Sequence, residues 1–349
     1  MVQVWLATRL SFAILAVVLA ISGERTLSSV LAQWDVEHYL GIAREGYADP
    51  QRMAFFPGWP LVLGLFESAG LPTVVLGSLV ASVCALLAAL ALQRLGGRFA
   101  AVAWLLAPTA IFTAVPYTEG AFCAAAFWAW ERAKSDRWGQ AALLASVACT
   151  LRVSGLFLIG ALLILAITQQ QTRTGDPRMT RLAWLLLPTA VLGIYLAYLY
   201  GLTGSWTAWY SAQQAGWQRD FHWPWQAIAN HIAQLNPNPE HPEWVWIFRG
   251  ELISWIVGLV VIVVALLRKQ IAEASWVGVQ VLALSLSQWL MSVNRSVLLW
   301  FPLWQQIGEY VESRPRTHGW ITAGVVTGVL AFVLQMVWAW LYFTGRWAS

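Results

Sequence analysis

The stretch Trp34–Pro60, WDVEHYLGIAREGYADPQRMAFFPGWP, is polar and ionisable, whereas the sequence on either side of it is strongly apolar. Its charged and titratable residues are Asp35, Glu37, His38, Arg44, Glu45, Asp49 and Arg52. The stretch lies between the first apolar run and the next long one, a position that predicts exposure at a membrane surface. Carboxylates there cost free energy unless they are solvated, paired or used. We therefore expect this stretch to hold the active site.

The composition excludes a soluble domain. Hydrophobic residues make up 59% of the chain and charged residues 11%, and 24 residues are Trp. A soluble domain would carry about 25% charged residues. Apolar segments follow one another with short polar breaks, so residues 1–349 are predicted to form a single integral-membrane domain. The basic residues are spread over loops rather than gathered in a stripe, which argues against nucleic acid as a partner.

Eleven apolar runs predict an all-α polytopic protein with about eleven transmembrane helices. The first run approaches the ~20 residues needed to cross a bilayer. A cleaved signal peptide is the alternative, because Ala20-Ile21-Ser22 resembles a cleavage site, but the extreme N-terminus MVQVWLAT lacks Lys and Arg. The predicted runs are Val4–Ser22, Leu71–Leu92, Ala100–Val115, Thr118–Trp130, Gly139–Leu151, Gly155–Thr168, Leu182–Gly201, Leu252–Leu267, Ser275–Met291, Val297–Ile307 and Trp320–Phe343.

The positive-inside rule orients these runs with the N-terminus in the cytoplasm. More than half of the 21 basic residues then lie in inner loops, namely Arg94, Arg98, Arg132, Lys134, Arg137, Arg173, Arg178, Arg181, Arg268, Lys269, Arg314 and Arg316. Most acids fall outside, namely Glu24, Asp35, Glu37, Glu45, Asp49, Glu67, Glu119, Asp220, Glu240, Glu243 and Glu251. The outer face is therefore expected to carry the chemistry. Its main segments are a first loop over 23–70 and a Trp-rich loop over 202–249.

Three short turns on the outer face hold unusual polar residues: Tyr117-Thr118-Glu119, Arg152-Val153-Ser154 and Asn294-Arg295-Ser296. We expect these turns to converge on the first loop. In that loop the apolar positions from Val36 to Ala43 keep a helical spacing, which predicts a short interfacial helix beginning at Asp35. Capping this helix is the structural alternative for Asp35.

The Trp-rich loop has two readings. Its indoles suit a headgroup-level belt, and some could instead line a groove for an isoprenoid or a sugar. Its proline-rich part, Asn236–Pro242, cannot be helical.

No metal or cofactor is expected. Cys84, Cys123 and Cys149 lie in apolar runs without CxxC spacing, which is typical of small buried hydrophobes. Asp35 and Glu37 point apart on a helix, and no HExxH pattern occurs. A phosphate-cradling glycine loop is also missing from the sequence, which argues against a directly bound nucleotide sugar.

Several motifs together resemble the PIG-V family. They comprise W-D-x-x-H-Y-x-x-I-A-x-x-G-Y from Trp34, A-F-F-P-G-W-P from Ala54, Pro108 with Ile111-Phe112 and Tyr117-Thr118-Glu119, the Arg152–Gly155 turn, Ser211–Gln214 with Trp217, and Asn294-Arg295 with Phe301-Pro302. Two positions depart from the pattern: Arg152 begins Arg-Val-Ser-Gly where Arg-Ser-Asn-Gly is expected, and Ser296 stands where Tyr is usual. The short outer loops suggest a bacterial relative in the plasma membrane, for which a GPI acceptor is in doubt.

The resemblance implies a function. PIG-V proteins are mannosyltransferases of GPI-anchor assembly within the GT-C superfamily of polytopic glycosyltransferases. Such enzymes take sugars from polyprenyl-phosphate donors at the outer or lumenal face, and a carboxylate of the first loop acts near the acceptor hydroxyl. That position corresponds to Asp35, which is expected to accept the hydroxyl proton in a displacement with inversion at C1 of a hexose, with mannose the first choice. The acceptor would be a lipid or a glycan, and protein partners stay undefined.

The remaining candidate site residues bind substrate in this interpretation. Arg152 and Arg295 would hold the lipid phosphate, or else extend to headgroup phosphates. Glu37 and His38 would orient Asp35 or bind sugar hydroxyls, or else form a solvated helix face. Glu119 would act on the acceptor side, or else complement a helix dipole. Gln214 and Trp217 are included because they match the family motif.

Two other classes stay open from the sequence. A secondary transporter or flippase of a lipid-linked sugar would also be all-helical, but it would show charged or broken mid-span segments and often a repeat. A non-catalytic partner subunit would keep the spans and lose the acids of the first loop. The presence of Asp35 in its motif favours an enzyme.

Overall fold

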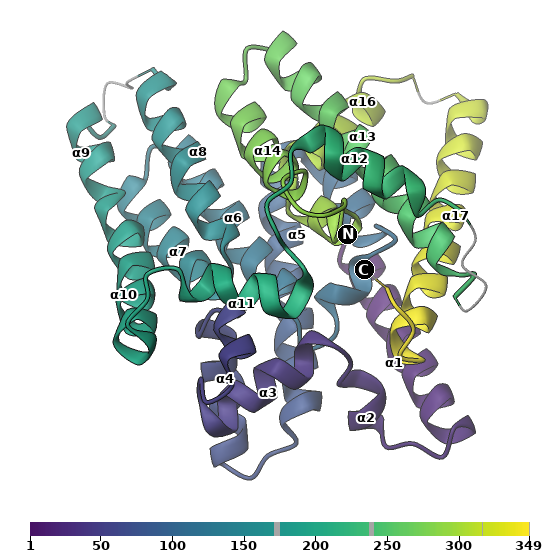
Figure 1. Cartoon of the computed structure of the whole chain (residues 1–349). Coiled ribbons are helices and arrows are strands. Elements are labelled where there is room, and N and C mark those ends of the chain that lie inside the picture. The colour runs from purple at the N-terminus through teal and green to yellow at the C-terminus, as the bar shows by residue number, and fades with distance from the viewer. Residues whose placement is uncertain (171–174, 237–240, 316, 349) are drawn as a thin grey trace. The chain divides into compact units, whose positions relative to one another are not determined.

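The computed structural model of the chain describes residues 1–170, 175–236, 241–315 and 317–348. All regular secondary structure in these ranges is helical (Figure 1), which confirms the predicted all-α class there. Some residues used in the sequence predictions lie outside the described residues, namely Arg173, Arg316, Glu240 and positions 237–239 of the proline-rich segment.

Five helical segments of the described chain are long and apolar enough to cross a membrane. They are α1 (Val2–Ser22), α5 (Thr73–Leu105), α9 with α10 (Arg178–Thr203), α13 (Trp244–Leu267) and α17 (His318–Phe343). Three shorter helices are also apolar: α7 (Trp138–Leu151), α8 (Ser154–Thr168) and α14 (Ile271–Leu284). These features are consistent with a polytopic membrane protein, while the number of eleven crossings stays a prediction.

Two of the predicted runs are not single helices. Ala100–Val115 is divided, because its first residues belong to the part of α5 that follows a non-helical break at Gly96 and Gly97 and ends at Leu105, and a separate short helix, η2, covers Ala110–Thr113. Pro108 lies between them and cannot continue a helix. Val297–Ile307 is also divided, into η3 (Val297–Leu299) and α16 (Phe301–Glu312), which has Pro302 in its first turn.

The predicted Trp-rich loop is more ordered than the sequence suggests. It contains α11 (Ala208–Trp217) and α12 (Pro224–Ala233). Furthermore, α13 begins at Trp244 rather than at the predicted Leu252, so the end of the loop is helical. The polar and aromatic residues there obscure the apolar periodicity that signals a helix.

The chain folds into two compact units. Unit 1 comprises Met1–Glu37, Val62–Phe127 and Leu298–Ala348, and unit 2 comprises His38–Leu61 and Trp128–Val297. The boundaries fall inside four helices: α3 (Asp35–Glu45), α4 (Gly58–Ser68), α6 (Glu119–Lys134) and the short helix η3. The single domain expected from the sequence stays a prediction.

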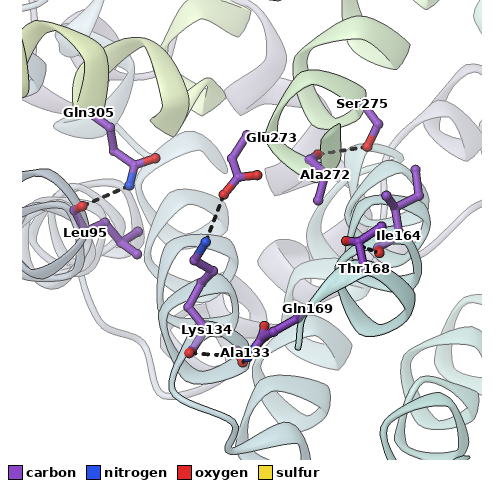
Figure 2. Close-up of polar contacts among 10 residues, drawn as sticks. All are labelled: Leu95, Ala133, Lys134, Ile164, Thr168, Gln169, Ala272, Glu273, Ser275 and Gln305. Carbon is purple, nitrogen blue, oxygen red and sulfur yellow. Dashed lines mark hydrogen bonds and ion pairs between the residues drawn. The ribbon is translucent and has the colours of Figure 1, made fainter. Parts of the chain in front are cut away.

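Within unit 1, α16 packs along α5, and α1 packs against α2 (Leu27–Leu31), α5 and α17. A kink at Gly96 and Gly97, where Gly97 has φ +78°, lets α16 approach closely. Gln305 of α16 donates to the carbonyl of Leu95 at 2.9 Å (Figure 2), and a Cβ at Gly308 would collide with the carbonyl oxygen of Gly96. Glycine is therefore required on both helices at this crossing.

Within unit 2, α14 packs against α8 and α13, α7 packs against α8 and α10 (Leu186–Thr203), and α11 packs against the short helix η1 (Pro50–Ala54). Charged residues meet at one end of this bundle. Lys134, at the end of α6, pairs with Glu273 in the first turn of α14 at 3.3 Å (Figure 2). Gln169, directly after α8, donates to the carbonyl of Ala133 (Figure 2). The end of α8 and the start of α14 therefore lie at the same end of unit 2.

The helix α17 in unit 1 is apolar and mostly exposed, with large aliphatic side chains along its length. Trp320 and Trp340 lie near its two ends. The guanidinium of Arg314 lies 5.5 Å from the ring centre of Trp320, and that of Arg346 lies 4.8 Å from Trp340. Each end of the exposed helix thus carries a cation stacked on an indole.

Candidate active site

Unit 2 contains a pocket of about 400 Å³ whose lining is cationic and aromatic. Three arginines line it: Arg152, Arg219 and Arg295. Phe157, Trp209, Tyr210 and Phe221 add aromatic surface, and Gln213, Gln280, Ser287 and Ser292 add polar groups. No Asp or Glu of the described chain lines it. The pocket therefore favours an anion that carries an apolar or carbohydrate group.

Each arginine enters the pocket from a break between helices. Arg152 is the extended residue that ends α7 before α8 begins at Ser154. Arg219 follows Gln218, the residue directly after α11, which has a left-handed conformation with φ +50°. Arg295 belongs to α15 (Val293–Ser296), a single turn after Ser292. Three separate turns thus contribute one guanidinium each.

The pocket lies at the opposite end of α8 and α14 from the ion pair of Lys134 and Glu273. Arg152 and Ser154 precede or begin α8, whereas Leu284 and Leu286 end or follow α14, and all four line the pocket. Since α8 has 15 residues, about 22 Å separates its two ends at ~1.5 Å per residue. The helices α8 and α14 are therefore antiparallel, with different charged groups at their two ends.

The helix α11 connects this pocket to the first-loop part of unit 2. Trp209 and Gln213, which line the pocket, both donate to the carbonyl of Ala54, at 3.2 and 3.3 Å. Tyr47 and Tyr195 donate their hydroxyls to the carbonyl of Phe55, each at 2.8 Å. Burial raises the pKa of Tyr47, so its hydroxyl keeps its proton. The Ala-Phe-Phe segment is therefore anchored through its backbone.

His38 and Trp217 come together in an aromatic cluster on that segment. The His38 ring stacks on Phe55 with centroids 5.0 Å apart, and Trp217 lies 5.5 Å from His38 and 5.1 Å from Phe55. His38 and Trp217 are both partly exposed. Flat, half-exposed rings of this kind can stack on the apolar face of a sugar or on a lipid chain.

Asp35 belongs to unit 1, at the start of α3. Trp34, before it, has the unusual φ of +55° and is 48% exposed. The backbone N–H of Asp35 donates to the hydroxyl of Tyr117 at 3.2 Å. Tyr117 is buried, with its ring centre 5.7 Å from that of Tyr342, whose hydroxyl donates to the carbonyl of Leu31. Buried tyrosines thus hold both the start of α3, through Asp35, and the end of α2, through Leu31.

The other predicted site residues differ in their surroundings. Glu119 lies in the first turn of α6, where an acid complements the helix dipole, as expected from the sequence. Its side chain is fully buried. Glu37 is exposed on α3. Gln214 donates to Asp220 at 3.0 Å and does not line the pocket. Among the residues described, no three His, Cys, Asp or Glu side chains form a group that could hold a metal ion.

The structure brings together Arg152 and Arg295 in one pocket, and His38 and Trp217 in one cluster. The sequence analysis did not select Arg219, Gln213 or Trp209, although all three line the pocket. The signal available was weak, since they flank or belong to the motif from Ser211 to Trp217. Arg219 lies in the predicted Trp-rich outer loop, outside the motif itself.

The helices of the described residues are consistent with a polytopic membrane protein, and unit 2 contains a pocket with a cationic lining. The profile of the family described as Mannosyltransferase (PIG-V) matches residues 8–199, more than half of the chain. The chain therefore belongs to the PIG-V mannosyltransferase family, as the sequence motifs predicted.

Curated relatives agree with the family. The chain is 33% identical over 153 residues to GPI alpha-1,6-mannosyltransferase 2 of Rattus norvegicus and 34% identical over 152 residues to that of Homo sapiens. Each match covers 38% of this chain and 31% of the relative. GPI mannosyltransferase 2 of Chaetomium globosum is 30% identical over 128 residues, 29% of this chain and 27% of the relative. The chain thus matches about a third of the length of these relatives. No solved structure matches it.

Proposed function

We propose that this protein is a membrane mannosyltransferase that transfers mannose from a polyprenyl-phosphate donor to a hydroxyl of a lipid or glycan acceptor. The observation that carries the proposal is the pocket lined by Arg152, Arg219 and Arg295, to which no acid of the described residues contributes. Its volume of about 400 Å³ falls in the range of small-ligand sites, roughly 300–1,000 Å³. The family supplies mannose as the sugar.

The charge of the pocket suits the leaving group. A polyprenyl-phosphate sugar is a phosphodiester with one negative charge, and the released polyprenyl phosphate carries about −1.5 to −2 at pH 7. Negative charge therefore grows on the phosphate as the bond from C1 to the phosphate oxygen breaks. Guanidinium groups that bind the more charged state more strongly lower the barrier. The departing oxygen keeps the electron pair, so no general acid is required.

Asp35 is assigned the role of general base. The acceptor oxygen attacks C1 while its proton passes to the Asp35 carboxylate, and the configuration at C1 inverts. The hydrogen bond from Asp35 N–H to Tyr117 and the buried Tyr342 support this role, because they fix the backbone that carries the carboxylate. His38 and Trp217 are assigned to stacking on a substrate. Glu37, Glu119 and Gln214 keep their sequence-based assignments.

The reaction is assigned to the extracytoplasmic face of the plasma membrane. Support comes from unit 2, where Lys134 and the pocket arginines lie at opposite ends of α8 and α14. Lys134 belongs to the side that the positive-inside rule makes cytoplasmic. A bacterial origin and an acceptor other than a GPI precursor remain parts of this proposal.

The test is transfer by the purified protein in detergent, with polyprenyl phosphate [³H]mannose as donor and a lipid extract as the acceptor source. The expected result is tritium in a new glycolipid together with an equal amount of free polyprenyl phosphate. Micelles enclose no compartment, so a flippase would leave the donor chemically intact. The lipid extract is taken from a strain that lacks the protein, so that it contains the acceptor before mannose is added. If the donor stays chemically unchanged in that assay, the proposal is overturned.

A further inference from the structure

Glu251 is a fully buried acid of α13 that the proposed reaction does not use. Its two carboxylate oxygens accept separate backbone bonds, from the N–H of Ser292 at 3.1 Å and from the N–H of Asn294 at 2.9 Å. A buried carboxylate is costly unless such bonds replace its hydration. The side chain is thus committed to the turn that precedes and forms α15.

Other groups on the same face of α13 hold the same turn. Ser254 donates to the side-chain oxygen of Asn294 at 2.9 Å, and the amide of Asn294 donates to the carbonyl of Ile247 at 3.3 Å. A Cβ at Gly250 would come within 3.1 Å of the Asn294 amide. Positions 247, 250, 251 and 254 share one helical face. This face forms a polar clasp, defined by Ile247, Gly250, Glu251 and Ser254.

The clasp stabilises an unfavourable backbone. Ser292 has φ +64°, in the left-handed region that non-glycine residues avoid. Ser296 adds a bond from its hydroxyl to the carbonyl of Ser292 at 2.8 Å. The turn presents Arg295 to the pocket, and Ser292 and Ser296 line the pocket beside it. Glu251 itself is not part of that lining.

We propose that Glu251 is a positioning residue that holds the Ser292–Ser296 turn so that Arg295 binds the phosphate of the lipid-linked donor. This inference rests on the proposed function, because it assigns a phosphate to the pocket. The carboxylate also occupies the N–H groups of Ser292 and Asn294, so anion binding from this turn depends on the Arg295 guanidinium. Glu251 acts only through Arg295.

Two Glu→Gln substitutions, one within α13 and one just before it, make a matched pair. Glu251→Gln retains one acceptor oxygen but places an amide NH₂ against a backbone N–H, two donors facing each other. A bond to a charged acceptor contributes on the order of tenfold in an equilibrium constant. Glu243→Gln makes the same chemical change just before α13, outside the clasp. Ser254→Ala removes one bond of the clasp and leaves the carboxylate in place.

The experiment measures binding of farnesyl phosphate to the purified full chain in detergent, with farnesol as the control without phosphate. Glu251→Gln is expected to raise the Kd for farnesyl phosphate about tenfold, Ser254→Ala about threefold, and Glu243→Gln not at all. Binding of farnesol should not change. In a chain that already carries Arg295→Gln, Glu251→Gln should not raise the Kd for farnesyl phosphate further. In a chain that carries Arg219→Gln, the fold increases in Kd from the two substitutions should multiply.

The outcomes separate the two proposals. If the wild-type chain binds farnesyl phosphate no better than farnesol, the pocket takes no phosphate and both proposals fail. Suppose that the wild type binds farnesyl phosphate and that Arg295→Gln raises its Kd. If Glu251→Gln then raises the Kd further in the Arg295→Gln chain, only the positioning role of Glu251 is overturned. If Glu251→Gln fails to fold, Ser254→Ala is used in its place. The inference is overturned if Ser254→Ala raises the Kd for farnesyl phosphate by the same factor in the wild type and in Arg295→Gln.

Discussion

The backbone N–H of Asp35 donates a hydrogen bond to the hydroxyl oxygen of Tyr117, 3.2 Å away. The two residues come from different motifs of the sequence, and this contact joins the motifs in the folded chain. Trp34, with φ +55°, brings the chain into this position immediately before α3. The start of the helix is thus determined by a tertiary contact.

Replacement of Tyr117 by Phe should slow transfer without weakening donor binding. The Asp35 N–H would lose its partner, and a lost hydrogen bond of about 1 kcal/mol corresponds to roughly a fivefold lower kcat. Steady-state kinetics with varied donor would measure this split. Tyr310→Phe, at an exposed tyrosine of α16, is the control and should behave as wild type. An increase in donor KM with unchanged kcat would contradict the prediction.

Asp35→Asn should reduce kcat by roughly 10²- to 10⁴-fold, the usual contribution of a general base. The measurement is the initial rate of tritium transfer, together with circular dichroism to check helicity. Asp49→Asn is matched in chemistry and lies in the same loop, where Asp49 caps η1 through the N–H of Gln51. An asparagine can keep that cap, so this control should retain activity. Full activity of Asp35→Asn would eliminate Asp35 as the base.

Arg219→Gln should lower kcat/KM for the donor about tenfold, because the pocket loses one charged hydrogen-bond donor. Arg219→Lys should restore part of the loss, since Lys keeps the charge without the planar fork. The control is Arg249→Gln, since Arg249 stacks on Trp246 at 4.8 Å and does not line the pocket. Equal losses in the Arg219 and Arg249 variants would indicate a general charge effect.

Gly308→Ala should lower the free energy of unfolding by about 1–3 kcal/mol, as overpacking does. Its Cβ would collide with the carbonyl oxygen of Gly96 and lie 2.9 Å from the Cβ of Ala100. Gly324→Ala on α17 meets nothing within 4 Å, so it should be neutral or slightly stabilising. Thermal unfolding in detergent compares the two. The prediction fails if both variants melt at the wild-type temperature.

The stability of unit 2 should fall as the pH drops below about 6.5. Burial lowers the pKa of His231 on α12, although its bond to the Phe248 carbonyl opposes this shift. In the unfolded chain the ring takes up a proton near pH 6.5, which the folded chain resists, so protonation favours unfolding. His231→Gln should flatten the melting temperature between pH 5 and 7, whereas His318→Gln, at an exposed site, should not.

The sequence predicted those features that depend on local pattern. Apolar runs identified the long helices, and Glu119 was correctly expected to begin one. The runs Ala100–Val115 and Val297–Ile307 contain Pro108 and Pro302, and each was predicted as one continuous helix. The structure divides each run near its proline. Gly96 and Gly97 lie between Arg94 and Arg98 in a predicted inner loop, and their non-helical backbone angles do interrupt α5 there. The close approach of Gly308 to Gly96 is a tertiary contact that the sequence did not indicate.

The candidate site was harder to predict from the sequence, because it depends on contacts between segments that are far apart in the chain. The motifs indicated Arg152 and Arg295, and the structure places both in one pocket. Arg219 carried no periodicity or spacing that distinguished it from other loop arginines. Glu251 was one of many outer acids, and only its bonds to Ser292 and Asn294 separate it from the rest.

The two indoles of α17 set a length scale. Trp340 follows Trp320 by twenty positions, which at ~1.5 Å per residue corresponds to about 30 Å along the axis. The hydrocarbon core of a typical bilayer is also about 30 Å thick. With Arg314 and Arg346 stacked on these rings, a thinner bilayer would force α17 to tilt, and a thicker one would draw a guanidinium into the lipid tails. The protein should therefore favour membranes of ordinary thickness.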